Sequence, residues 1–461
     1  MKMTAAEVAS WVDGMLELGR DDMPIEGTSI DSRTLEPGSL FVAIVGPNHD
    51  GHRYVDQALD RGAAGVVVSR PTELKRPAVR IRVSDTTKAL QQLAATVRRQ
   101  AALKVVAITG SMGKTTTKEA TALALGARYR VLKSEKNLNN MYGVPLSILK
   151  HRDEEVAVLE LGMSAPGEIA RLTEIVKPDV AVLTNVAEVH REFFPSVEAI
   201  ARAKGELFDG LGGNSVAVVN ADDPHVLEQA RRFSGQKLLF GFDKSADVRA
   251  DKLTRRMDGV RFVVHHRSET MPVQVPIMGK HNVYNLLASL AVAVVLDVPL
   301  ASAAAELSSL GPPPHRGERV RFRGNILVID ETYNSNPTAL RSVLDSFGDE
   351  DATRRIAVLG DMLELGERAV PLHLECGRFV ATAKVDLLIA VGPLSRYIVE
   401  GARQVGMPED AMLTAEDALE AGRQVSARFE AGDVILFKAS RGVGLDRAIE
   451  ALRERIGEES V

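Results

Sequence analysis

The sequence predicts an α/β protein of three domains, of which the second and third are built on buried parallel sheets. The chain has 461 residues, more than a single hydrophobic core usually organises. Near-continuous apolar runs alternate with helix-like stretches, the pattern of strands covered on both faces. The alternation is interrupted at "GPPPHRGER", where three consecutive prolines favour a stiff linker. We therefore expect domains over residues 1–100, 101–312 and 313–461.

The first hundred residues predict a small mixed α/β domain. Short apolar runs flanked by glycine-containing turns predict strands, and a helix over Thr86–Gln100 is expected to close the domain. The opening "MKMTAAEVASWVDGMLELG" lacks the basic and apolar regions of a signal peptide and is typical of an amphipathic helix. The predicted strands are Phe41–Val45, Gly65–Val68 and Val79–Val83.

The second and third blocks place polar side chains where their predicted strands end. In the second block, Glu160 closes one strand, and Thr184, Asn185 and Asn220 follow others. Because parallel sheets bind ligands at the carboxyl ends of their strands, we expect functional sites there. The predicted strands are Val105–Ile108, Val156–Leu161, Val180–Leu183 and Val216–Val219, then Ile326–Ile329, Ile356–Leu359, Leu387–Val391 and Val434–Phe437.

The overall composition excludes several classes of protein. The formal net charge of −5 argues against a general nucleic-acid binder. The single cysteine, Cys376, cannot form an intrachain disulfide and fits a reducing compartment. The longest nearly apolar run, Leu286–Leu296, is too short to span a bilayer. We expect a cytoplasmic protein that is monomeric, is not inserted in a membrane and binds no nucleic acid.

The stretch "ITGSMGKTTTKEA", Ile108 to Ala120, predicts a phosphate-binding loop between a strand and a helix. Gly110 and Gly113 let backbone amides approach phosphate oxygens, and the helix that follows favours anions at its amino end. Lys114 supplies a mobile positive charge, and the Thr115 hydroxyl is a suitable ligand for Mg²⁺. The usual pattern has a glycine where Ile108 stands. The competing interpretation is a solvated strand-to-helix turn.

A second ligand for the metal is expected from Glu160, because a carboxylate in an apolar strand is costly unless it is paired or metal-bound. The alternative for Glu160 is a carboxylate that faces water at the strand end. His190 lies shortly after another predicted strand and is a further candidate, although isolated histidines are usually surface or core residues.

The loop "TGSMGKTTTKE" resembles the ATP loop of the Mur ligases and their relative folylpolyglutamate synthase, whose shorter glycine pattern accounts for Ile108. The whole chain is similar to the branch of that family that adds D-alanyl-D-alanine to a UDP-linked muramoyl tripeptide. The matching stretches, in the expected order, are "IDSRTLEPGSLFVAIVG", "KNLNNMYGVPLSIL", "ELGMSAPGEI", "AKGELFDGL", "GKHNVYNLLA", "IDETYNSNP" and "LGDMLELG".

The resemblance implies a fold and a reaction. It implies an N-terminal domain that recognises UDP, a central P-loop ATPase domain with a parallel sheet, and a C-terminal Rossmann-like domain that closes over the site. The carboxylate of UDP-N-acetylmuramoyl-tripeptide would attack the γ-phosphate of ATP, and the amine of D-alanyl-D-alanine would attack the resulting acyl phosphate. The product would be the pentapeptide precursor of peptidoglycan, formed with ADP and phosphate.

The resemblance also implies roles for residues at the nucleotide and metal sites. Lys114 would hold the β- and γ-phosphates, within a loop comprising Gly110, Ser111, Gly113, Lys114, Thr115 and Thr116. Thr115 and Glu160 would bind one Mg²⁺, and His190 would help to bind a second. Lys204 matches a lysine that the family carbamylates; otherwise it is an ordinary helix lysine. ATP would also be contacted by Asn282, which could instead cap a helix, and by Arg316 and Asp330.

Substrate recognition is implied for three further groups of residues. Ser29, Asp31, Ser32 and Arg33 match the stretch that binds the UDP sugar. Asn139 and Asn140 match a segment near the substrate phosphates and the metal. Asp361, Glu364 and His373 belong to the segment most characteristic of the branch, which we associate with the amine substrate. Lys438, Ser440 and Arg441 form a late signature to which the resemblance assigns no role.

The chain departs from the family pattern at a few positions, and other functions compete. None of these departures replaces an expected catalytic residue. They are Met112, Glu331, Ala439 and the stretch "REFFPS" that follows His190. The ligase that adds the third amino acid should carry Asp-Asn-Pro-Arg, which is not found in the chain. A regulatory P-loop switch should carry Asn-Lys-x-Asp or an effector loop. A silent binding protein would not be expected to keep Lys114, Glu160, His190 and Lys204 together.

Overall fold

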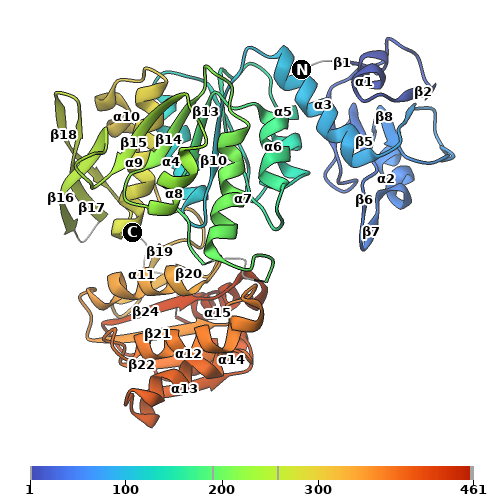
Figure 1. Ribbon diagram of the computed structural model, residues 1–461. Coiled ribbons are helices and arrows are strands. Elements are labelled where there is room, and N and C mark those ends of the chain that lie inside the picture. Colours follow the sequence, from blue (N-terminus) through green and yellow to red (C-terminus); the bar gives the residue numbers. More distant parts are fainter. Residues whose placement is uncertain (1–2, 189–191, 257–258, 457–461) are drawn as a thin grey trace.

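The computed structural model describes residues 3–188, 192–256 and 259–456. Three sheets of five, nine and six strands organise the N-terminal, central and C-terminal parts of the chain. In Figure 1 the N-terminal part lies to one side of the central part, joined to it along helix α3 (Thr86–Gln100), and the C-terminal part lies below. The α/β fold predicted in three parts is confirmed.

The N-terminal sheet has the strand order β2-β9-β8-β5-β4 and is parallel except for the pair β2 and β9. The expectation of a single N-terminal helix was wrong, because only Ala5–Trp11 is helical and Asp13 adopts φ +51° before β2 begins. The elements are β1 Met3–Thr4, α1 Ala5–Trp11, β2 Met15–Leu18, β3 Pro24–Ile25, β4 Gly27–Ser29, β5 Ser39–Val42, β6 Val45–Gly46, β7 His49–Asp50, α2 Val55–Asp60, β8 Gly65–Val68 and β9 Val79–Arg82.

The central sheet has the order β11-β12-β10-β13-β14-β15-β16-β17-β18. It is parallel from β11 to β16, and an antiparallel extension that the sequence did not predict adds β17 and β18. The strands are β10 Lys104–Thr109, β11 Val131–Lys133, β12 Val156–Glu160, β13 Val180–Leu183, β14 Val216–Asn220, β15 Gln236–Gly241, β16 Val248–Arg256, β17 Gly259–His266 and β18 Glu269–Val275.

Helices cover both faces of the central sheet, so its strands are apolar at consecutive positions. In β10, Val105 and Ala107 belong to one core while Val106 and Ile108 belong to the other, as the alternation of a strand requires. The helices are α4 Lys114–Gly126, α5 Gly143–Leu149, α6 Glu168–Val176, α7 Val197–Asp209, α8 Pro224–Ala230, α9 Lys280–Val295 and α10 Leu300–Leu307.

The C-terminal sheet has the order β19-β20-β24-β21-β22-β23, with only β19 antiparallel to its neighbour. Helices again cover both faces, with Ala357 and Ile356 of β21 in opposite cores. The elements are β19 Glu318–Phe322, β20 Ile326–Glu331, α11 Pro337–Gly348, β21 Arg354–Gly360, α12 Ala369–Val380, β22 Leu387–Val391, α13 Arg396–Gln404, β23 Met412–Ala415, α14 Ala418–Ser426, β24 Asp433–Lys438 and α15 Asp446–Ile456.

An ion cluster joins the central and C-terminal parts. The Glu350 carboxylate, which is 8% exposed, pairs with Arg255 of β16 and with Arg319 of β19, the latter at 2.8 Å. Arg255 also donates to the Ser346 carbonyl at 2.9 Å. These contacts fix one edge of the interface between the two parts. Among the described residues no helix is long and apolar enough to cross a membrane.

Candidate functional site

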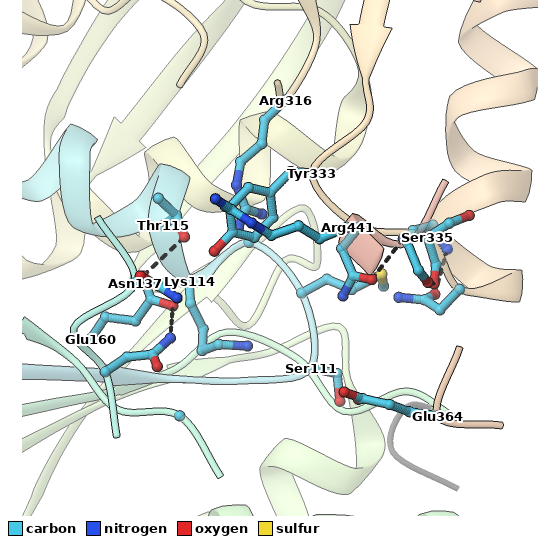
Figure 2. A pocket seen from close by; sticks show the side chains of 18 of the residues that line it. Ser111, Lys114, Thr115, Asn137, Glu160, Arg316, Tyr333, Ser335, Glu364 and Arg441 are labelled. Atoms are coloured by element: carbon cyan, nitrogen blue, oxygen red, sulfur yellow. Dashed lines mark hydrogen bonds between the residues drawn. The ribbon is translucent and has the colours of Figure 1, made fainter. Parts of the chain in front are cut away.

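A cavity of about 750 Å³ opens where the central and C-terminal parts meet. The central part contributes the loop after β10, the segment 137–142 and the carboxyl end of β12, while the C-terminal part contributes the ends of β20, β21 and β24. Figure 2 shows side chains from both parts facing the same space, with Lys114, Thr115 and Glu160 on one side and Arg316, Tyr333 and Arg441 on the other. The carboxyl ends of two mostly parallel sheets therefore face each other across the cavity, and these ends are where ligand sites were expected.

The phosphate-loop geometry requires both of its glycines. Gly110 has φ +153°, and a Cβ there would lie 1.9 Å from the Thr184 hydroxyl oxygen. Gly113 has φ +79°, and a Cβ there would lie 2.1 Å from Oδ1 of Asn285. Any larger residue would displace neighbours and strain the backbone. Helix α4 begins directly afterwards at Lys114, so its free amide groups point into the cavity.

Met112, which the sequence left as a bulky residue in a tight loop, is held through its backbone. Its amide donates to Asn185 Oδ1 at 2.9 Å, and its carbonyl accepts from Thr184 Oγ1 at 2.7 Å. The Met112 side chain forms part of the cavity wall. The Lys114 ammonium donates to the Gly110 carbonyl at 2.7 Å, and burial lowers its pKa, with Glu160 opposing the shift.

Glu160 lies at the centre of a polar cluster that suits a divalent cation. It is 3% exposed, so the alternative that it faces water at the strand end was wrong. Its two carboxylate oxygens accept from Thr115 Oγ1 and from Asn139 Nδ2, both at 2.9 Å. A carboxylate and a hydroxyl are the hard oxygen ligands that Mg²⁺ prefers, and a buried carboxylate without a cation pays a desolvation cost. The donor set therefore fits the metal that the loop implies.

Lys204 lies on α7 and lines the same cavity. It is 1% exposed, and no hydrogen bond or ion pair to its ammonium is found among residues 3–188, 192–256 and 259–456. Burial lowers its pKa well below the ordinary value, and Lys114 adds to the effect. A lowered pKa increases the fraction of the amine that is uncharged and therefore nucleophilic. The alternative of an ordinary solvated helix lysine is wrong.

The expected nucleotide residues of the later chain lie at the junction of the two parts. Asn282 donates to the Met278 carbonyl at 2.8 Å and accepts from Asn285 at 3.0 Å, and Gly279 rather than Asn282 begins the cap of α9. Arg316 lines the cavity with its guanidinium 3.8 Å from the centre of the Tyr333 ring. Asp330 is buried and accepts from His315 and from Thr332, so it lies behind the cavity wall.

Comparison with known proteins identifies the family. A model described as Mur ligase middle domain matches residues 108–293, one described as Mur ligase, glutamate ligase domain matches 315–441, and one described as Mur ligase family, catalytic domain matches 24–98. A UDP-N-acetylmuramoyl-tripeptide–D-alanyl-D-alanine ligase of Bacillus subtilis is 36% identical, over 98% of this chain and 99% of its own. This chain belongs to the Mur ligase family.

Solved Mur ligases have the same fold along their whole length. A crystal structure of MurF from Acinetobacter baumannii matches with a TM-score of 0.90 at 30% identity, over 99% of both chains. A MurF ligase from Thermotoga maritima in complex with ADP matches with a TM-score of 0.83 at 31% identity, over 93% of this chain and 97% of its own. The three-part resemblance predicted from the motifs is confirmed.

The residues expected to recognise substrates separate into two locations in this Mur ligase. Asn139, Asn140 and Glu364 line the cavity. The segment from Ser29 to Arg33 lies in the N-terminal part, where Arg33 pairs with Asp31 at 2.8 Å and lowers the pKa of that carboxyl to about 2. Ser32 donates to Gln57 at 2.7 Å. His190 lies outside the described residues.

Asp361 and His373 lie behind the cavity wall and hold the loop that forms it. His373 is fully buried, with Nδ1 donating to the Ala369 carbonyl at 2.6 Å and Nε2 accepting from the Met362 amide at 3.0 Å. Burial lowers its pKa, so the ring is neutral. Asp361 accepts from the amides of residues 394 and 395. Both side chains fix the loop from 361 to 365 and do not line the cavity.

Several cavity residues were not singled out from the sequence. Tyr333, His281 and Asn285 line the cavity. Asn285 also accepts a hydrogen bond from the hydroxyl of Thr117, which lies 168 residues earlier in the chain. Lys438 is buried and donates to Glu331 at 3.2 Å and to the Asn334 carbonyl at 3.0 Å. Glu331, a departure from the family pattern, thus has a lysine as its partner. Lys438 itself was named in the sequence, as part of a late signature without a role. The signal for Tyr333, His281 and Asn285 was their place inside two of the matching stretches, "IDETYNSNP" and "GKHNVYNLLA".

Proposed function

We propose that this chain joins D-alanyl-D-alanine to the tripeptide carboxylate of UDP-N-acetylmuramoyl-tripeptide with consumption of ATP. The observation that carries the proposal is one cavity in which a phosphate loop, a carboxylate–hydroxyl pair for Mg²⁺, a buried lysine with a lowered pKa and two arginines converge. The names of its full-length relatives support the same two substrates, and the ADP complex of the Thermotoga relative supports ATP.

In the first step a carboxylate oxygen of the tripeptide attacks the γ-phosphorus of ATP, and ADP leaves. Backbone amides of the loop from Gly110 to Thr116 would hold the phosphates, and Lys114 would stabilise the charge that develops on the transferred group. Arg316 would contact the nucleotide from the C-terminal part, and Asn282 would contact the adenine base. Asp330 would support Arg316 through its hydrogen bond with the neighbouring His315. Bound Mg²⁺, held by Thr115 and Glu160, would neutralise the opposing phosphate and carboxylate oxygens.

In the second step the neutral amine of D-alanyl-D-alanine attacks the acyl carbon, loses a proton, and phosphate leaves. Lys204 lies in the cavity with a lowered pKa and without an acidic partner among the described residues, which suits carbamylation by CO₂. The carbamate would be an anionic oxygen donor near Lys114. His190 would be a donor for a second Mg²⁺. The segment from Ser29 to Arg33 would recognise the UDP sugar.

Other functions within and outside the family fit less well. A ligase for a different amino acid or folylpolyglutamate synthase would share the central cavity, yet the full-length relatives at 30% to 36% identity carry the D-alanyl-D-alanine name. A nucleotide switch would not require the C-terminal residues that face the loop. Because the reaction consumes ATP and Cys376 is a free thiol, we expect it to take place in the cytoplasm.

The direct test is phosphate release from the purified chain with a panel of acceptors. We expect release that depends on ATP, Mg²⁺, UDP-N-acetylmuramoyl-tripeptide and D-alanyl-D-alanine together, with formation of the pentapeptide product. A requirement for L-lysine, diaminopimelate or glutamate in place of the dipeptide would reassign the chain within the family.

A further inference from the structure

The C-terminal part presents an arginine to the cavity that the two reaction steps leave unused. Arg441 begins the short turn after β24, is exposed, and lines the cavity. Its guanidinium lies 5.3 Å from the centre of the Tyr333 ring, and Figure 2 shows it reaching toward Tyr333 and Arg316. Within the part of the chain that the structure describes, no carboxylate pairs with Arg441.

The other charges on the cavity wall already have partners or assigned roles. Glu331 pairs with Lys438, and Glu160 is bound by Thr115 and Asn139. Glu168 accepts from the amides of residues 164 and 165. Arg316 is expected to contact the nucleotide. Arg441 is therefore a cation available for a further anion, and a guanidinium suits a carboxylate because it can donate two parallel hydrogen bonds.

Leu363 is an apolar neighbour of Arg441 on the same wall. Its side chain is 43% exposed although it is large and hydrophobic, and it lines the cavity. A Cβ added to Gly442 would lie 2.9 Å from Leu363 Cδ1, so the leucine side chain lies against the backbone beside Arg441. An exposed leucine beside an unpaired arginine is complementary to a small apolar residue that ends in a carboxylate.

Hydrogen bonds keep Arg441 and Leu363 next to each other on the cavity wall. The Leu363 amide donates to Ser440 Oγ at 2.9 Å, and the Ser440 amide donates to the Asp361 carbonyl at 3.0 Å. The buried His373 fixes the intervening Met362 amide at 3.0 Å. The turn that carries Arg441 and the loop that carries Leu363 are thus connected through their backbones. A recognition site built on such supports is preorganised.

The incoming dipeptide carries an anion that needs a permanent partner. The tripeptide carboxylate loses its charge when it becomes the acyl phosphate, whereas the carboxylate of the incoming dipeptide stays charged through both steps. We propose that Arg441 binds the C-terminal carboxylate of that dipeptide and that Leu363 contacts the methyl group of its last residue. This inference rests on the proposed function and names the residues that recognise its second substrate.

The test measures phosphate release by the full chain with D-alanyl-D-alanine and with D-alanyl-D-alaninamide, which lacks the carboxylate. The wild type is expected to show a KM about 10- to 100-fold lower for the acid, the range of one charge-assisted pair. R441Q should raise the KM for the acid by the same factor, lose the preference over the amide, and leave the KM for ATP within twofold. R396Q, which alters an exposed arginine stacked on Tyr397 outside the cavity, is the matched control and should behave as wild type.

The outcomes separate the possible roles. If R441Q keeps the preference for the acid, another group binds the carboxylate and the proposal is overturned. If R441Q instead raises the KM for ATP, Arg441 serves the nucleotide and the proposal is equally overturned. If the wild type releases phosphate without regard to any dipeptide, the proposed function itself fails, and the arginine variant is not needed to show it. Loss of the preference with an unchanged melting temperature supports the proposal.

A second pair of substrates tests Leu363. The wild type should prefer D-alanyl-D-alanine over D-alanylglycine by about fourfold, the contribution of one buried methyl group. L363A should lose that preference and keep the preference for the acid over the amide. An L363A variant that still discriminates by the methyl group would show that another surface contacts it.

Discussion

Replacement of Lys204 by methionine should stabilise the protein and inactivate it. Lys204 as a residue is 1% exposed, and its ammonium has no hydrogen-bond partner among the described residues. Burial of such a group without a partner costs about 1–3 kcal/mol, which the methionine side chain of similar length avoids. For a domain of this size each kcal/mol raises the melting temperature by about 2–4 °C, so we expect an increase of roughly 5 °C. Turnover should fall because the proposed carbamate on Lys204 can no longer form.

The stability difference should depend on pH in a defined direction. Burial lowers the pKa of Lys204 below its ordinary value of 10.5, so the folded protein binds fewer protons than the unfolded chain. The loss of folding free energy that this difference causes has its maximum below the pKa of Lys204 in the folded protein. It disappears as the pH rises toward 10.5. The advantage of K204M over the wild type should therefore shrink by about 1.4 kcal/mol for each pH unit in that upper range.

The assay is denaturant unfolding followed by circular dichroism, in buffer free of CO₂ and metal, at pH 7.5, 8.5 and 9.5. Addition of bicarbonate and Mg²⁺ should stabilise the wild type and leave K204M unchanged. For activity, K204A should regain turnover with short-chain carboxylates, which can occupy the space of the carbamate. A K204M variant that is less stable than the wild type, or a K204A variant that is fully active without rescue, would refute the reasoning.

Three further substitutions test the remaining parts of the site and the interface. Lys114→Ala should lower phosphate release by about 1,000-fold or more without unfolding the protein, as saturating kinetics and a melting curve will show. Thr115→Val should raise the Mg²⁺ concentration for half-maximal activity by about 10- to 100-fold, whereas Thr115→Ser should keep it near the wild-type value. Arg255→Gln should lower the free energy of unfolding by about 1–3 kcal/mol in calorimetry, because Glu350 loses one of its two arginine partners. The control Arg256→Gln, at an exposed neighbouring position, should change the free energy of unfolding by less than about 0.5 kcal/mol.

The fold was predictable where strands are buried on both faces. Gly65–Val68, Val180–Leu183 and Leu387–Val391 were expected with the bounds that the structure has, because helices on both faces select apolar residues at every position. The antiparallel extension was not predicted, since strands such as Val248–Arg256 alternate between buried and charged residues and lack such a run. The N-terminal helix was overestimated because a turn at Asp13 interrupts its apolar periodicity.

The site was predictable where a short motif contains its own chemistry. The loop from Gly110 to Thr115 could be found because one local pattern contains it, and Glu160 could be found because a carboxylate in an apolar strand needs a partner; both line the cavity. Asn285 and Tyr333 could not, because their proximity to the loop arises from packing between distant segments. His373 was associated with the amine substrate by its motif, and the structure places it behind the loop it supports.

Phosphate release with both substrates present tests the central claim most directly. The purified chain, ATP, Mg²⁺ and UDP-N-acetylmuramoyl-tripeptide should release little phosphate until D-alanyl-D-alanine is added, and one equivalent of the pentapeptide product should then form for each phosphate released. Equal release with and without the dipeptide, or release without the UDP-linked tripeptide, would contradict the account.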